Sequence, residues 1–253
     1  MLADFHNHSC LSPCGSLDMS PRVIAEIAAE RNVKVLALTD HNTSRNCPAF
    51  AFHCKRLNII PLFGLEVTTQ EEVHMLTLFT VLDAAMTFGD YIYSMITPFP
   101  NNPEIAGDQV YVDNDDNIIG ELEFYLSGAA AIGVDELGTV ASTYGALVIP
   151  AHVDRPAFSM SSQLGVVVKG AWAALECVQI PPYKVMGNIT SELLETHSYP
   201  LIRSSDAHYT EHIGRRPFNL DISEEELLPN GPDGEADVNA LVQALKMRPR
   251  DRW

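Results

Sequence analysis

The feature that most limits the fold of this chain is an alternation of short apolar segments with longer segments of helical periodicity. Runs of branched and apolar residues predict strands at residues 2–5, 33–38, 59–65 and 74–81. Apolar residues at helical spacing predict helices at residues 20–31, 48–57 and 83–96. The first of these helices begins with Ser20 and Pro21, a favourable N-cap and first-turn pair. The N-terminal part therefore predicts repeated strand–helix units.

A proline-rich stretch interrupts this alternation. Residues 97–107 predict a loop, and residues 110–112 and 118–124 predict a hairpin around the acidic turn 113–117. The turn lacks the glycine and glutamate that a twelve-residue calcium loop needs at positions 6 and 12, so a solvated turn is favoured. We expect residues 97–133 to form an insertion that either caps the mouth of the fold or contacts another subunit.

The alternation resumes in the C-terminal half. Strands are predicted at residues 146–150, 173–178 and 200–202, and helices at residues 134–144, 191–197 and 236–247, while residues 218–222 have no assigned element. About seven strands alternating with helices, without a linker, favour an α/β fold in which residues 1–253 form one parallel (β/α)7 barrel. The chain has no Gly-x-Gly-x-x-Gly after a strand and no phosphate-binding loop, which argues against a Rossmann or P-loop fold.

The charge balance limits the partners. Acidic residues outnumber basic ones 33 to 16, and the net charge of −17 disfavours long duplex nucleic acid and anionic membrane surfaces. No apolar run is long enough to span a bilayer and no leader precedes Phe5, so we expect a soluble, cytoplasmic protein. The 5 cysteines form an odd, scattered set, which favours reduced thiols over a disulfide framework.

Potential metal ligands follow the predicted strands. In a barrel, the C-terminal ends of the strands converge, and a His-x-His pair there places both imidazoles on one side. One such histidine alone is more often structural, but coincidence at many strand ends is improbable. Imidazole mixed with carboxylate suits zinc, manganese or iron, and one ion needs only three or four ligands. We therefore expect two to three ions and a bridging Glu66. The strand-end candidates are His6, His8, His41, Glu66, His152, Asp206 and His208.

These residues lie in motifs that resemble a known family, the polymerase and histidinol phosphatase (PHP) superfamily of metal-dependent phosphoesterases. The motifs are Asp4-Phe5-His6-Asn7-His8-Ser9, Thr39-Asp40-His41-Asn42, Gly64-Leu65-Glu66-Val67, His74, His152 and Ser205-Asp206-Ala207-His208. The resemblance implies a distorted, TIM-like barrel of seven strands with a trinuclear site. It implies one ion held by His6, His8, Glu66 and Asp206, a second held by Glu66, His74 and His152, and a third held by His41, His208 and one more ligand.

That last ligand is where the sequence departs from the family, whose members commonly carry an aspartate five residues, or a histidine six residues, after the second histidine. Pro13 and Cys14 occupy these positions here. Cys14 can bind a metal as a thiolate, which would favour zinc or iron. Alternatively it is a loop residue, and the third ion is weakly held. Asp4 and Asp40 are expected outside the ligands, accepting ring N–H groups of ligating histidines, or else as turn caps.

The expected reaction is hydrolysis of a phosphate ester of a small molecule or nucleotide. A metal-activated hydroxide, formed from metal-bound water, would attack phosphorus, and the chain shows no signature of a protein nucleophile. Arg155 is the expected contact for a phosphate oxygen. Two alternatives stay open. One is an amidohydrolase-like C–N bond hydrolase, disfavoured because no metal-bridging lysine follows a strand, and the other is a non-catalytic PHP binding module.

Overall fold

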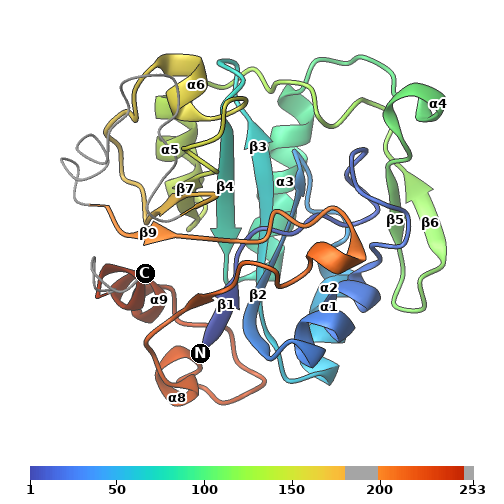
Figure 1. The fold of residues 1–253 in the computed structure, drawn as a ribbon. Coiled ribbons are helices and arrows are strands. Elements are labelled where there is room, and N and C mark those ends of the chain that lie inside the picture. The colour runs from blue at the N-terminus through green and yellow to red at the C-terminus, as the bar shows by residue number, and fades with distance from the viewer. Residues whose placement is uncertain (180–198, 248–253) are drawn as a thin grey trace.

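The structure, a computed structural model, describes residues 1–179 and 199–247. Its centre is a curled six-stranded sheet in the order β10-β1-β2-β3-β4-β7 (Figure 1). Its strands are β1 (Leu2–Asp4), β2 (Val33–His41), β3 (Ile60–Thr68), β4 (His74–Phe79), β7 (Leu147–Pro150) and β10 (Phe218–Asn219). Five of the six were expected as strands, whereas β10 lies in residues 218–222, to which no element was assigned.

The sheet is mixed rather than parallel. β1, β2 and β3 run parallel, whereas β4 is antiparallel to both of its neighbours and β10 is antiparallel to β1. The expected all-parallel alternation is therefore wrong at β4. The physical reason is the connection: residues 69–73 suffice for a hairpin, but a parallel crossover needs a dozen residues or more.

Two short strands, β8 (Leu175–Glu176) and β9 (Leu201–Ile202), form a separate parallel pair. Ala173 N–H donates to Val148 O near β7, and a parallel bridge joins Ala207 to Asn7 beyond β1. The described residues thus form a curled half-barrel that is consistent with a TIM-like barrel. They do not form one continuous seven-stranded sheet.

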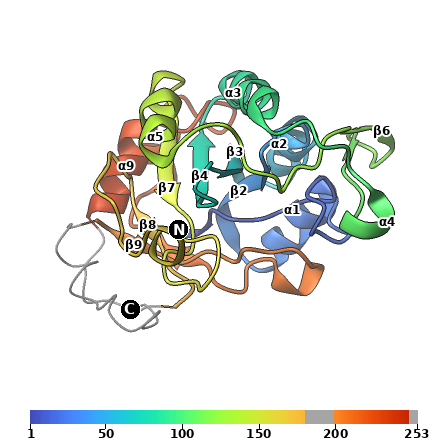
Figure 2. The ribbon, with the colours of Figure 1, turned by 90° about the horizontal axis from the view of Figure 1, so that it is seen from above.

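Helices cover the outer face of the sheet (Figure 2). They are α1 (Pro21–Glu30), α2 (Cys47–Arg56), α3 (Leu82–Met95) and α5 (Val134–Thr143). Because side chains alternate along a strand, Leu36 and Leu38 join the core under these helices, whereas Val35 and Ala37 join a second, inner core. Two helices, α8 (Glu224–Leu227) and α9 (Val238–Lys246), pack against the lower end of the inner core (Figure 1). Of these two helices, α9 was predicted from the sequence and α8 was not.

The insertion lies beside α2, at the edge of the molecule (Figure 1). It contains the short α4 (Pro103–Ala106), which was not predicted, and the predicted hairpin of β5 (Val110–Val112) and β6 (Ile118–Glu121). In its acidic turn, an oxygen of Asp113 accepts the N–H groups of Asp115 and Asn117, so the turn satisfies itself. Asn42 Nδ2 donates to the carbonyls of Leu126 and Gly128 and ties the insertion to the end of β2.

Two further features complete the described chain. The short helix α6 (Met160–Leu164) begins at a capping box on Ser159, and no pattern predicted it. The helix expected at residues 191–197 lies outside the described residues. No helix within the described ranges is both long and apolar enough to cross a membrane.

Candidate metal centre

Strand parity brings three candidate ligands to the inner side of the sheet. Glu66 continues the inward series of Ile60 and Leu62 on β3, and β2 pairs His41 directly with it. His74 begins β4 and shares the parity of Leu76. Because β4 is antiparallel, its first residue lies at the same rim as the last residues of β2 and β3. A histidine that starts its strand therefore still joins those that end theirs.

Glu66 lies at the centre of the site and is buried. Its Oε1 lies 3.3 Å from His6 Nε2, 2.8 Å from His74 Nδ1 and 3.1 Å from His152 Nε2. Its Oε2 lies 3.2 Å from His8 Nε2 and 3.3 Å from His41 Nδ1. Burial would raise the pKa of this carboxyl, but the surrounding imidazoles hold it well below its usual value. Glu66 is thus an ionised carboxylate shared by five histidines.

Asp206 extends this cluster on one side. His6 Nε2 and His8 Nε2 lie 3.1 Å apart, and Asp206 Oδ1 lies 3.5 Å and 3.6 Å from them. Donor atoms that share an ion at about 2.1 Å are separated by roughly 3.0–3.4 Å. The spacing of these three side chains therefore suits ligands of one cation.

Cys14 extends the cluster on another side. Ligand atoms of His8, Cys14, His41 and His208 lie within 4.8 Å of one another, as do those of His41, Glu66 and His74. Although Cys14 is exposed at the surface, partial desolvation of its thiol, together with the charges of Glu66 and Asp206, raises the pKa of this group to about 12. The structure therefore brings together all nine sequence-predicted metal ligands, but His8 and His41 each belong to two of these groups.

Second partners fix the orientation of three rings. His6 Nδ1 lies 3.0 Å from Glu176 Oε2, and His208 Nδ1 lies 3.1 Å from Asp206 O. His8 Nδ1 donates to Ser12 Oγ at 3.0 Å, since that hydroxyl itself donates to Asp40 Oδ1 at 2.7 Å. A ring that donates from Nδ1 keeps a free electron pair on Nε2. All three rings can therefore offer Nε2 to a cation.

Three buried imidazole nitrogens have no hydrogen-bond partner: Nδ1 of His41, of His74 and of His152. Unpaired buried polar atoms are rare and costly, and a cation would satisfy Nδ1 of His41 and of His74, which face the Glu66 carboxylate at 3.3 Å and 2.8 Å. Two ligand candidates also have a left-handed backbone, with φ of 30° at His152 and 48° at Asp206. Such strain in non-glycine residues clusters at functional sites. The residues present therefore fit a metal cluster.

The N-terminal half of the chain, residues 4–122, matches the PHP domain family. The match includes the candidate ligands from His6 to His74, while His152, Asp206 and His208 lie beyond it. None of the curated proteins compared with the chain matches it.

Solved structures with a similar fold cover nearly the whole chain. The lesion-specific endonuclease PfuEndoQ from Pyrococcus furiosus is 18% identical at a TM-score of 0.61, and the match covers 97% of this chain but 55% of the endonuclease. A provisionally assigned metal-dependent phosphoesterase from Bifidobacterium adolescentis is 16% identical at a TM-score of 0.59, with 96% and 95% covered. An amidohydrolase from Chromobacterium violaceum is 17% identical at 0.50, with 86% and 91% covered. The chain therefore shares their fold.

Glu176 is the site residue that the sequence analysis missed. Its buried carboxylate accepts both His6 Nδ1–H and, at 2.9 Å, the backbone N–H of His152. Burial would raise its pKa, but His6 outweighs this and lowers it. The one sequence feature that could have identified Glu176 is that it is a charged residue inside the apolar stretch 173–178. Glu176 has the role that was expected of Asp4 and Asp40.

Among the residues that the structure describes, neither of those two aspartates accepts a hydrogen bond from an imidazole ring. Asp4 accepts backbone N–H groups of Ser205 and Gly214, and burial raises its pKa to about 6. It therefore anchors the segment that carries Asp206 instead of orienting a ring. Asp40 accepts from Ser9 and Ser12 and reaches His8 only through the Ser12 hydroxyl. The expected direct contact fails because the short Ser12 side chain lies between the carboxylate and the ring.

Arg155 lies at the rim of the site with its side chain 41% exposed. Its Nη1 donates to Asp206 Oδ2 at 3.0 Å, on the oxygen opposite the one that faces His6 and His8. Arg215 and Arg216 donate to the carbonyl of Ser205. The three guanidinium groups therefore brace the segment around Asp206, and Arg155 is positioned between this segment and solvent.

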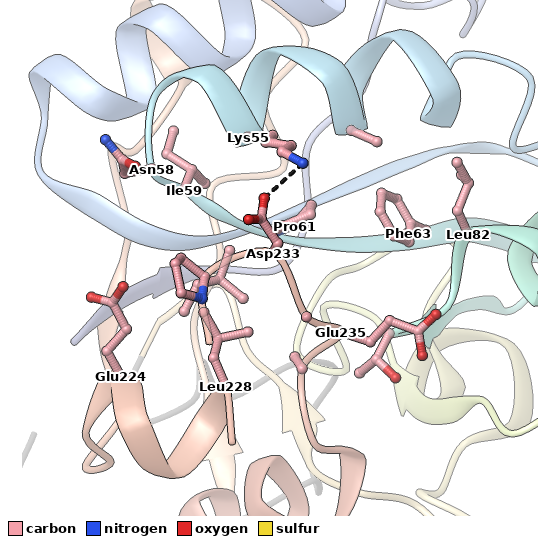
Figure 3. Close-up of a pocket in the computed structure, with 16 residues that line it drawn as sticks. Lys55, Asn58, Ile59, Pro61, Phe63, Leu82, Glu224, Leu228, Asp233 and Glu235 are labelled. Atoms are coloured by element: carbon pink, nitrogen blue, oxygen red, sulfur yellow. Dashed lines mark ion pairs between the residues drawn. The ribbon is translucent and has the colours of Figure 1, made fainter. Parts of the chain in front are cut away.

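A cavity of about 230 Å³ lies at the other end of β3 (Figure 3). It is lined by residues of α2, of the start of β3 and of the segment 224–236, and two of its lining residues, Lys55 and Asp233, form an ion pair at 2.7 Å (Figure 3). Its lining contains no histidine or cysteine. This cavity is therefore separate from the candidate metal centre.

Proposed function

We propose that the chain is a metal-dependent phosphoesterase that hydrolyses a phosphate ester of a small molecule or nucleotide. The observation that supports this most is the buried Glu66 carboxylate, within 3.3 Å of nitrogens from five histidines, in a chain whose residues 4–122 match the PHP domain family. Imidazole, carboxylate and thiol donors together suit zinc, manganese or iron. We expect two to three such ions.

The ligands divide among three positions. His6, His8, Glu66 and Asp206 would hold one ion, Glu66, His74 and His152 a second, and Cys14, His41 and His208 a third. Bound divalent ions would acidify a water molecule and offset the charge of a phosphate group. A cation beside Cys14 would also displace the thiol proton, which the metal-free site holds strongly.

The residues around the ligands have their own tasks. Glu176 and Ser12 hold protons on Nδ1 of His6 and His8, so that Nε2 of both rings faces the cluster. Arg155 presents a planar, half-exposed guanidinium group that can bind a non-bridging phosphate oxygen while it holds Asp206. No side chain is assigned as a nucleophile.

Charge favours a small substrate. Glu66, Asp206 and a Cys14 thiolate carry three negative charges against six positive charges of three divalent ions, which leaves a formal local surplus near +3. Exposed charges more than about 10 Å away are largely screened at 0.1 M salt, so this surplus can attract a phosphate group. The net charge of −17 acts against a long DNA duplex. The similar endonuclease is longer, since the match covers only 55% of it.

The test combines elemental analysis with a substrate panel. Protein loaded with zinc or manganese should hold two to three equivalents of metal and release phosphate from at least one monoester or nucleotide. His6→Ala should lower the rate at least a hundredfold, comparable to the loss of one electrostatic stabiliser. His212→Ala, which removes a histidine that is in none of the ligand groups, should leave the rate unchanged.

Three other outcomes would contradict the proposal. Metal-loaded protein that is inert on phosphate esters but hydrolyses cyclic amides would be a C–N bond hydrolase. Protein that holds metal and is inert on the whole panel would be a binding module. Cleavage of a duplex oligonucleotide in preference to mononucleotides would refute the small substrate.

A further inference from the structure

We propose that Phe158 forms a stacking subsite beside the metal centre, which binds a planar aromatic group in the ester portion of the substrate. The inference rests on the proposed phosphoesterase function and specifies its substrate class. It concerns a residue that no sequence motif identified.

Phe158 contacts His74, one of the candidate metal ligands. Its ring stacks on the imidazole of His74, with centroids 4.8 Å apart and planes inclined by 15°. The backbone N–H of His74 donates to Phe158 O at 2.9 Å, and Nδ1 of the same histidine lies 2.8 Å from Glu66. Only one imidazole ring therefore separates Phe158 from the central carboxylate.

The phenyl ring is exposed although one of its faces is covered. Phe158 is 40% exposed, whereas Phe5, Phe50 and Phe88 are fully buried. Phe158 also belongs to none of the hydrophobic cores found within residues 1–179 and 199–247. Since His74 covers one face, the exposed area lies on the opposite face and the edges. The fold therefore leaves a substantial part of this apolar side chain in contact with solvent.

The backbone at this position is strained. Phe158 has a φ of 55°, a left-handed conformation in which a bulky residue is an outlier and glycine would fit without cost. Ser159 holds the segment, because its Oγ donates to Arg155 O at 2.7 Å while capping α6. Phe158 thus occupies a backbone conformation that favours glycine. Strained residues of this kind are found preferentially at binding and catalytic sites.

The same loop supplies the other parts of a binding site. His152 faces Glu66, and Arg155 presents its guanidinium group at the rim. A phosphate at the centre would then place its ester group beside the open face of Phe158. Aromatic side chains bind planar rings by stacking, and nucleobases are common examples. The preferred ester alcohol is therefore one with an aromatic ring, such as a nucleoside.

The test compares two phosphate esters of primary alcohols, benzyl phosphate, which carries an aromatic ring, and glycerol 1-phosphate, which carries none. Phe158→Ala should lower the ratio of kcat/KM for benzyl phosphate to that for glycerol 1-phosphate about tenfold, mainly through KM. Phe158→Tyr, which keeps the ring, should restore the ratio. Phe52→Ala removes a phenylalanine of similar exposure, 42%, on α2 and should not change it.

A binding measurement makes the test independent of turnover. Metal-loaded wild type should bind benzylphosphonate more tightly than methylphosphonate in calorimetry, and Phe158→Ala should lose this preference while keeping its metal content. An equal loss on both substrates, a fall in bound metal, or no preference in the wild type would overturn the subsite. If no phosphate ester is hydrolysed while the phosphonate preference depends on Phe158, the proposed function fails but the subsite stands.

Discussion

The replacement Glu176→Gln tests whether the buried carboxylate prepares His6 for a cation. The carboxylate accepts two N–H donors, His6 Nδ1 at 3.0 Å and His152 N at 2.9 Å, and is only 2% exposed. Both donors lie closest to the same oxygen, Oε2, so a glutamine oxygen placed there could accept from both, but the NH2 group would then replace Oε1, which lies 3.2 Å from His6 Nδ1. The glutamine also loses the charge that strengthens the bond to His6.

The expected cost follows from these contacts. Burial alone would lower the pKa of His6, but Glu176, Glu66 and Asp206 hold it well above its usual value. Replacing a residue that orients a metal-binding histidine typically lowers metal affinity or activity by about 10- to 100-fold, or roughly 1.4–2.8 kcal/mol. We expect a loss in this range, because Glu176 holds one ligand directly and the backbone of a second.

The assay is a zinc titration in competition with a chromophoric chelator, followed by phosphate release from the best substrate. The control is Glu225→Gln, which makes the same change at an exposed position on α8. Equal zinc affinity, within twofold, for Glu176→Gln and the wild type would refute the argument that Glu176 fixes the His6 tautomer.

Two further predictions address other contacts of the site. Ser12→Ala should lower the free energy of unfolding of the metal-free protein by about 1–3 kcal/mol, because Asp40 and His8 lose a shared buried partner. Urea denaturation measures this, and a change below about 0.5 kcal/mol would contradict it. Cys14 is the one exposed cysteine and should react first with iodoacetamide, and zinc should slow this reaction. Peptide mass spectrometry measures the labelling, and equal labelling of the four buried cysteines would contradict the packing.

Much of the fold could be predicted because local patterns determined it. The outward Leu36 and Leu38 and the inward Val35 and Ala37 show the period-two alternation of a strand buried on both faces. The Ser20-Pro21 start of α1 was visible in the same way. The direction of β4 was misjudged because apolar content carries no information on direction. The shortness of the connection 69–73 was the usable signal.

The candidate site, like the fold, has a part that the sequence predicts and a part that it does not. Strand-end histidines were recognisable because spacing alone places their side chains on one side. Glu176 was not, since nothing in the stretch 173–178 shows that its carboxylate meets His6, which is separated from it by 170 residues in sequence. The hydrogen-bond partners of Asp4 and Asp40 could not be predicted from the sequence either, because these partners are backbone N–H groups and a serine hydroxyl, which no sequence pattern identifies.

The pairing of β1 with β10, and of Asn7 with Ala207, has a consequence for biosynthesis. His6 and His8 precede Asp206 and His208 in the sequence, so they leave the ribosome earlier. A nascent chain that has passed His152 but has not reached Asp206 therefore lacks part of every proposed ion position except the one at Glu66, His74 and His152. We expect metal uptake to be a late event that distinguishes finished molecules from fragments.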